Sequence, residues 1–172
     1  MLRFFKSVFL ILLIIPLLIT ALTGCTYTPD VSTVAYRLYS LYPSAPPCSR
    51  YYKNASGSPY GHISPEDLFF LYVGERKVIA EWDVIEDFYV ILSDTPSSFE
   101  LHVFRAVSAA DVDELEKLLS KRAELIRYHN ATEAFYPAFE PDVFVRGRYA
   151  VLAVTPDNEA VRLMLKELLG GI

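Results

Sequence analysis

The chain has 172 residues, is 52% hydrophobic and carries a formal net charge of −5. Its length suits a single domain and is sufficient for a sizeable core. The acidic balance argues against nucleic-acid binding, because phosphate contacts need clustered Lys and Arg. Only two cysteines occur, with no CxxC and no zinc-type spacing, so the sequence predicts no metal site and no cofactor.

The first 24 residues have the three parts of a secretory signal peptide. Arg3 and Lys6 supply the positive start, residues 8–19 form an apolar run, and small residues lead into Cys25. A membrane-spanning helix needs roughly 20 apolar residues, and Pro16 strains a continuous helix in this shorter run. We therefore expect this segment to be removed. The alternatives are an uncleaved anchor and an ordinary signal peptide followed by a chance Cys.

The order Leu22-Thr23-Gly24-Cys25 resembles the lipobox of bacterial lipoproteins. In those proteins the Cys thiol accepts a diacylglycerol group and a peptidase cuts before the Cys. Two acyl chains anchor firmly, because each buried CH₂ contributes about 0.8 kcal/mol. The resemblance implies a signal peptide over 1–24, a lipidated Cys25 with a short tether over 25–29, and a single domain over 30–172. Cys48 then has no partner within the mature chain.

Helix and turn signals organise the first part of this domain. Apolar residues at helical spacing, with Asp30 as N-cap, predict a helix over 31–41. Residues 42–63 are rich in Pro, Gly and Ser and predict a long loop. Ser64, followed by Pro and two acidic residues, predicts a short helix over 65–73.

Two strand–strand–helix units follow in series. Runs around 88–92 and 99–107, joined by a turn, predict a hairpin that leads into a long helix. Runs around 143–145 and 148–154 predict a second hairpin, followed by a helix that starts near Pro156. The expected fold is a two-layer α+β domain, in which an antiparallel sheet of about four strands carries helices on one face.

The long helix has a start signal and a core-facing stripe. Ser108 and Asp111 have the spacing of a capping box. Apolar residues at helical spacing then form the stripe: Val112, Leu115, Leu119 and Ile126.

No catalytic set is recognisable in the sequence. His62, His102 and His129 fall in a loop, a strand and a helix end, and no spacing joins them to a Ser or Cys in a nucleophile motif. Four carboxylates surround Trp82: Glu81, Asp83, Glu86 and Asp87. Paired carboxylates act in glycosidic chemistry or hold Ca²⁺, but the Gly of the Ca²⁺ loop pattern is absent, which favours a solvated acidic turn.

Tyrosines cluster in the first stretch after Cys25. Seven of the twelve lie between residues 27 and 60. Tyr carries apolar area and a polar tip, so Tyr51, Tyr52 and Tyr60 are candidates for a surface that binds cell-wall glycan or a protein partner. The alternative is that these rings pack the long loop onto the sheet.

Two motifs resemble a family of small Gram-positive lipoproteins that carry a domain of unknown function. One is the strand over 100–106, Glu-Leu-His-Val-Phe-Arg-Ala, which leads into a charged helix, and the other is Gly147-Arg148-Tyr149, which opens the last strand. The likeness covers roughly residues 30–169, although the loop over 42–63 is longer than the family pattern. The family has no assigned reaction, so the resemblance implies no active-site residues.

These observations favour a lipid-anchored lipoprotein on the extracytoplasmic face of a bacterial cell membrane, with a small binding or structural domain. Its expected partners are the membrane, through the lipid, and a protein or a cell-wall component. The alternative is a cell-envelope enzyme that uses the acidic cluster at Glu81 and Asp83, or His62.

Overall fold

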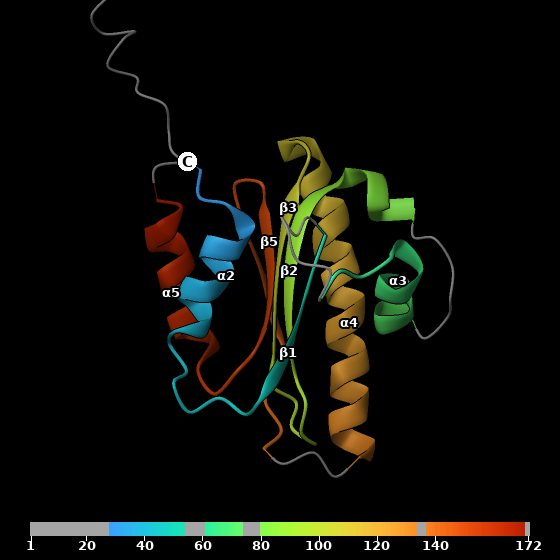
Figure 1. The fold of residues 1–172 in the computed structure, drawn as a ribbon, viewed down its shortest axis with the longest axis vertical. Helices are drawn as coiled ribbons and strands as arrows, with labels where there is room; N and C mark the ends of the chain where they lie inside the picture. The colour runs from blue at the N-terminus through green and yellow to red at the C-terminus, as the bar shows by residue number, and fades with distance from the viewer. Residues whose placement is uncertain (1–27, 54–60, 74–79, 134–136, 171–172) are drawn as a thin grey trace, which may run out of the picture. The chain divides into compact units, whose positions relative to one another are not determined.

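The computed structural model describes residues 28–53, 61–73, 80–133 and 137–170 (Figure 1). Within this part of the chain, Pro29–Gly170 forms one compact unit. The predicted signal segment, Cys25 and Tyr60 lie outside the described residues.

The described residues form α-helices, short 3₁₀ helices and β-strands. In chain order they are α2 (Val31–Tyr39), β1 (Cys48–Tyr52), α3 (Pro65–Val73), η1 (Ala80–Val84), β2 (Ile85–Ser93), β3 (Glu100–Ala106), η2 (Ala109–Asp111), α4 (Val112–Thr132), β4 (Asp142–Arg146), β5 (Tyr149–Val154) and α5 (Asn158–Leu168).

The strands form one antiparallel sheet in the order β1-β2-β3-β5-β4. Both predicted hairpins are present, as β2–β3 and β4–β5, and the pairing of β3 with β5 joins them at the centre. The predicted α+β class and the antiparallel sheet are therefore confirmed.

The strand count differs from the expected number of about four, because β1 adds a fifth strand. It lies inside the segment 42–63, which the sequence predicted to be a loop, and pairs with β2 from Cys48 opposite Ser93 to Tyr52 opposite Tyr89. The neighbouring prolines predict turns rather than a strand. None of the strand's residues is fully buried, so the sequence carries no strong apolar pattern here. Pairing with β2, rather than local preference, makes the segment extended.

The helices cover both faces of the sheet, which corrects the expected two-layer arrangement. Helices α2 and α5 lie on one face, and α3 and α4 lie on the other (Figure 1). Along β2, Phe88 and Val90 contribute to the core under α3 and α4, whereas Tyr89 and Ile91 contribute to the core under α2 and α5. All residues of β5 are buried. Strands that are apolar on both faces need cover on both sides, so the fold has three layers.

Side-chain caps begin helices at Asp30 and Ser108 as the sequence predicted, whereas α5 begins at Asn158, after Pro156 and not in a turn that contains it. The Asp30 carboxylate accepts a hydrogen bond from the Thr33 backbone N–H at 2.7 Å, and Asp157 caps α5 in the same way. Ser108 and Asp111 form the predicted capping box before α4. Each cap satisfies backbone donors that would otherwise lack partners at the helix start.

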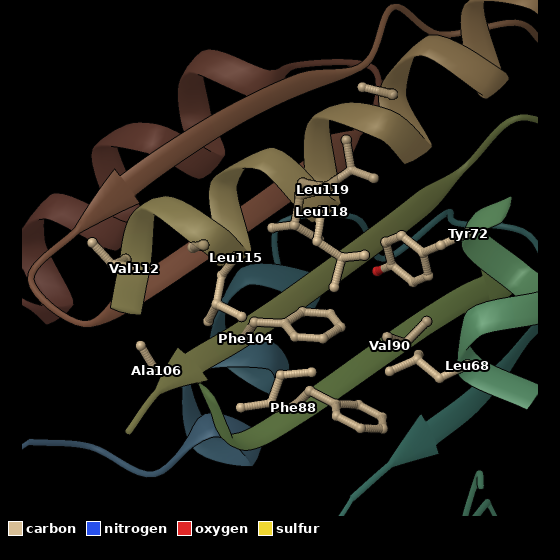
Figure 2. Close-up of a cluster of buried hydrophobic side chains, with 14 of the residues drawn as sticks. Leu68, Tyr72, Phe88, Val90, Phe104, Ala106, Val112, Leu115, Leu118 and Leu119 are labelled. Carbon is tan, nitrogen blue, oxygen red and sulfur yellow. The ribbon is translucent and has the colours of Figure 1, made fainter. Parts of the chain in front are cut away.

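The core under α4 brings together aromatic and aliphatic side chains from several elements (Figure 2). Phe88 and Phe104 stack with their ring centroids 5.1 Å apart. Leu115 is fully buried among these side chains, as the predicted stripe of α4 requires. Apolar burial of this kind is the main favourable contribution to the folding free energy.

We expect Phe104→Ala to lower the free energy of unfolding by about 3–5 kcal/mol, because the change removes a fully buried ring and leaves a cavity. Urea denaturation followed by circular dichroism measures this loss. Leu163→Ala is the control, because Leu163 is 59% exposed, and it should change stability by about 0.5 kcal/mol or less. Equal effects of the two substitutions would contradict the described packing.

Candidate functional site

Two hollows adjoin at the end of the sheet where the turn between β2 and β3 lies. One has a volume of about 400 Å³ and is lined mostly by rings and prolines, and the other has a volume of about 230 Å³ and is lined mostly by polar side chains. Thr95, Ser97 and Phe99 line both of them. This end of the domain is therefore the candidate functional site.

The larger hollow, which we call the proline pocket, is built from four separate connections between elements. They are the segment after α2, the turn between β2 and β3, the residues before β4 and the residue after Thr155. Its rings and prolines are Tyr42, Pro43, Pro46, Phe99, Pro137, Phe139 and Pro156. Proline has a fixed φ angle, so these connections hold the walls of the pocket in place.

Hydrogen bonds hold Tyr42 at the wall of the proline pocket. Its hydroxyl lies 2.9 Å from the Thr155 hydroxyl oxygen and donates to the backbone oxygen of Asp157. Its ring meets Phe99 edge to face, with the ring centroids 5.7 Å apart. Burial raises the pKa of the Tyr42 hydroxyl, and the nearby Asp157 charge acts in the same direction. The Tyr42 hydroxyl is therefore engaged in hydrogen bonds within the protein, and Tyr42 lines the pocket.

The smaller hollow, which we call the polar hollow, contains an ion pair between β3 and α4. Its polar lining is Ser93, Thr95, Ser97, Ser98, Glu100, Arg122, His129 and Asn130. The Arg122 Nε lies 3.1 Å from Glu100 Oε2, and its Nη2 lies 2.5 Å from Glu100 Oε1. Two parallel bonds of this kind make a strong and directional pair. Arg122 also donates to the backbone oxygen of Leu71 in α3 at 2.9 Å.

Behind the ion pair, His102 links Glu100 to Tyr72. The His102 Nε2 lies 2.9 Å from Glu100 Oε2, and its Nδ1 lies 2.5 Å from the Tyr72 hydroxyl oxygen. This pattern fits a neutral ring in which Nε2–H donates to the carboxylate and Nδ1 accepts from the hydroxyl. The chain Tyr72–His102–Glu100–Arg122 therefore joins α3, β3 and α4.

Burial and charge act in opposite directions within this network. Burial lowers the pKa of His102, and the Glu100 carboxylate only partly offsets this effect. Burial by itself would raise the pKa of Glu100, but the hydrogen bond from His102 and the positive charge of Arg122 outweigh it and lower that pKa. The network thus contains a neutral imidazole beside an ionised carboxylate and guanidinium.

The order Tyr–His–Glu has the form of a proton relay, but no substrate can reach it. Tyr72 is 1% exposed and His102 is 0% exposed, so the hydroxyl and the imidazole lie inside the core. A general base must come within about 3 Å of the proton that it removes. The network is consequently a structural brace, and only its Glu100–Arg122 end borders a hollow.

The structure separates the tyrosines that the sequence grouped into one surface. Tyr51 packs against the core under α4, whereas Tyr52 packs against the core under α2. Successive residues of a strand point to opposite faces, so Tyr51 and Tyr52 do not share one patch. The guanidinium of Arg50 lies 5.5 Å from the ring centroid of Tyr39, on the α2 side of the sheet.

Neither His62 nor Asp83, which the sequence suggested for an enzyme, lines one of the two hollows. His62 and Asp83 are exposed, and the side chain of Glu81 lies outside the described residues. Glu86 is bound by Arg105 and Arg148, at 3.0 Å and 2.7 Å. In the part of the chain that the structure describes, no group of three or more His, Cys, Asp or Glu residues is placed to hold a metal ion.

Comparisons with protein-family models, curated proteins and solved structures found no match to this chain. Among the described helices, none is long and apolar enough to cross a membrane. Cys48 is a half-buried free thiol that donates to the Pro46 backbone oxygen at 3.1 Å. The features that indicate a function are therefore the two hollows and the sequence before Pro29.

Sequence reasoning did not find the proline pocket. Each of its prolines is locally a signal for a turn or a helix end, and residues from segments as distant as Pro43 and Pro137 meet only in the folded domain. Glu100 and Arg122 were likewise not singled out as a pair, because they are far apart in the sequence and adjacent only where β3 contacts α4.

We expect Arg122→Met to lower the free energy of unfolding by about 3–5 kcal/mol, because the Glu100 carboxylate is then buried without its guanidinium partner. Glu100→Gln combined with Arg122→Met should recover part of this loss. Urea denaturation measures both. The control is Arg127→Met on the same helix, whose ion pair with Glu140 is exposed and should contribute about 1 kcal/mol or less.

Acidification should destabilise the domain through His102. Because its pKa is lower in the folded state, the unfolded chain binds more protons as the pH falls below the ordinary pKa of histidine, about 6.5. Stability should therefore decrease from pH 7 downward until the folded-state pKa is passed. His102→Gln should reduce this loss of the free energy of unfolding, measured by urea denaturation from pH 7 down to the folded-state pKa of His102. His62→Gln, at an exposed site, should leave the pH dependence of stability unchanged. If the wild type and both variants lost stability equally with falling pH, His102 would not be the group responsible.

Proposed function

We propose that this chain is a lipid-anchored lipoprotein on the extracytoplasmic face of a bacterial membrane, and that its domain binds a ligand in the proline pocket. The observation that carries the binding role is a preformed hollow of about 400 Å³, a volume within the range of small-molecule sites. The anchor rests on the positive, apolar and small residues that precede Cys25.

The short stretch of sequence between Cys25 and the domain supports a close attachment to the membrane. The compact unit begins at Pro29, whose backbone oxygen accepts a hydrogen bond from the Tyr149 hydroxyl. Four residues of extended chain reach about 14 Å at most. A lipid on Cys25 would therefore hold the Pro29 end of the domain near the bilayer surface.

The proline pocket lies at the other end of β5. Tyr149 is the first residue of β5, and Pro156 of the pocket comes shortly after its last residue, Val154. A six-residue strand is about 20 Å long. In a protein tethered through Cys25, the pocket would be directed away from the membrane, where a ligand from outside the cell can enter it.

Cys25→Ser tests the anchor. We expect the substituted chain to remain as an uncut precursor and to incorporate no radiolabelled fatty acid, because the thiol that accepts the lipid is absent. Gel mobility and label incorporation in a bacterial host measure these effects. Cys48→Ser is the matched control and should be lipidated and cut like the wild type. A Cys25→Ser chain that is still cut and membrane-bound like the wild type would rule the lipid anchor out.

A further inference from the structure

We infer that the proline pocket accepts a neutral aromatic small molecule. This inference deepens the binding role proposed above and rests on it. It follows from the charge of the lining, from its hydrogen-bonding groups and from the flat surfaces that form its walls.

The lining of the pocket carries no charge among the described residues. It consists of prolines, aromatic and aliphatic side chains, and the hydroxyl-bearing residues Ser44, Thr95 and Ser97. An ionised ligand that enters such a site loses its water and finds no opposite charge, which costs several kcal/mol or is avoided by neutralisation. The pocket therefore selects against anions and cations.

Most polar groups near the pocket already have partners within the protein. The Tyr42 hydroxyl donates to Asp157, the Ser97 hydroxyl accepts from the Phe99 N–H, and the Ser97 N–H donates to Thr95. Prolines have no N–H to offer. A ligand with many hydrogen-bonding groups would lose bonds to water without replacing them, so the preferred ligand has few.

The walls favour a flat ring over an extended polar molecule. Tyr42 and Phe99 meet edge to face at an interplanar angle of 75°, and Phe139 and the proline rings also line the hollow. Aromatic rings prefer offset-stacked or edge-to-face contacts with other rings. Because the proline backbone is already restricted, little conformational entropy is lost when a rigid ligand binds.

Photolabelling with two related probes tests the inference on the full chain, purified in detergent. Benzophenone is a neutral aromatic photoprobe, and benzophenone-4-carboxylate differs from it by one negative charge. After irradiation, mass spectrometry maps the labelled peptides. We expect benzophenone adducts to concentrate on segments 41–46, 95–99 and 137–139, with about tenfold fewer adducts of the carboxylate there, equivalent to about 1.4 kcal/mol.

Matched variants connect the labelling to the pocket. Ser44→Asp adds a carboxylate to the exposed rim of the pocket and should reduce benzophenone labelling of these segments about fivefold or more. Val107→Asp adds the same charge at an exposed residue outside the pocket lining and should leave labelling unchanged. Circular dichroism checks that both variants fold, and the comparison of probes on the wild-type chain does not depend on either variant.

Equal labelling of the pocket segments by both probes, or adducts spread over α4 with no excess at the pocket, would overturn the inference. The same experiment on Cys25→Ser separates this outcome from failure of the anchor. Pocket labelling that persists in Cys25→Ser, whether or not the first 24 residues of that variant are cut off, supports the ligand class independently of the anchor. Loss of pocket labelling in a chain that is lipidated normally removes the ligand class and leaves the anchor intact.

Discussion

The central strands of this domain are buried on both faces, and the rest of the structure follows from that constraint. Strand β5 has no exposed residue, and β3 is buried along nearly its whole length. An antiparallel sheet commonly leaves one face in water, but these strands cannot do so without exposing a large apolar area. Helices must therefore cover both sides. The pair α2 and α5 covers one face, and α3 and α4 cover the other (Figure 1).

Within one of these two cores, a polar network controls how the layers meet. Glu100 and Arg122 are a bidentate pair between sheet and helix, and His102 and Tyr72 extend the pair to α3. Buried charges are costly unless their partners are well placed, so breaking this network costs stability even where its net contribution is small. It gives α3 and α4 a defined position on the sheet, and thereby shapes the polar hollow.

The two ends of the domain would have different roles in the proposed function, one in attachment and the other in ligand binding. Pro29, four residues after Cys25 in the chain, is held at the start of β5, and the proline pocket lies beyond the far end of that strand. If Cys25 carries the proposed lipid, the domain would present this hollow away from its attachment. The relay-like arrangement of Tyr72, His102 and Glu100 is closed within the core, so no substrate reaches its imidazole.

Local signals in the sequence determined the helix starts, both hairpins and the α+β class, because caps, turns and short-period patterns act between neighbouring residues. Asp30, Ser108 and Asp111 have the predicted roles. The sequence also supplies the whole case for lipidation of Cys25, which lies outside the described residues. Only the tertiary structure decided that β1 is a strand, that helices cover both faces, and that prolines from distant connections form one pocket. Each of these depends on contacts between segments far apart in the chain, and no local pattern encodes which segments will meet.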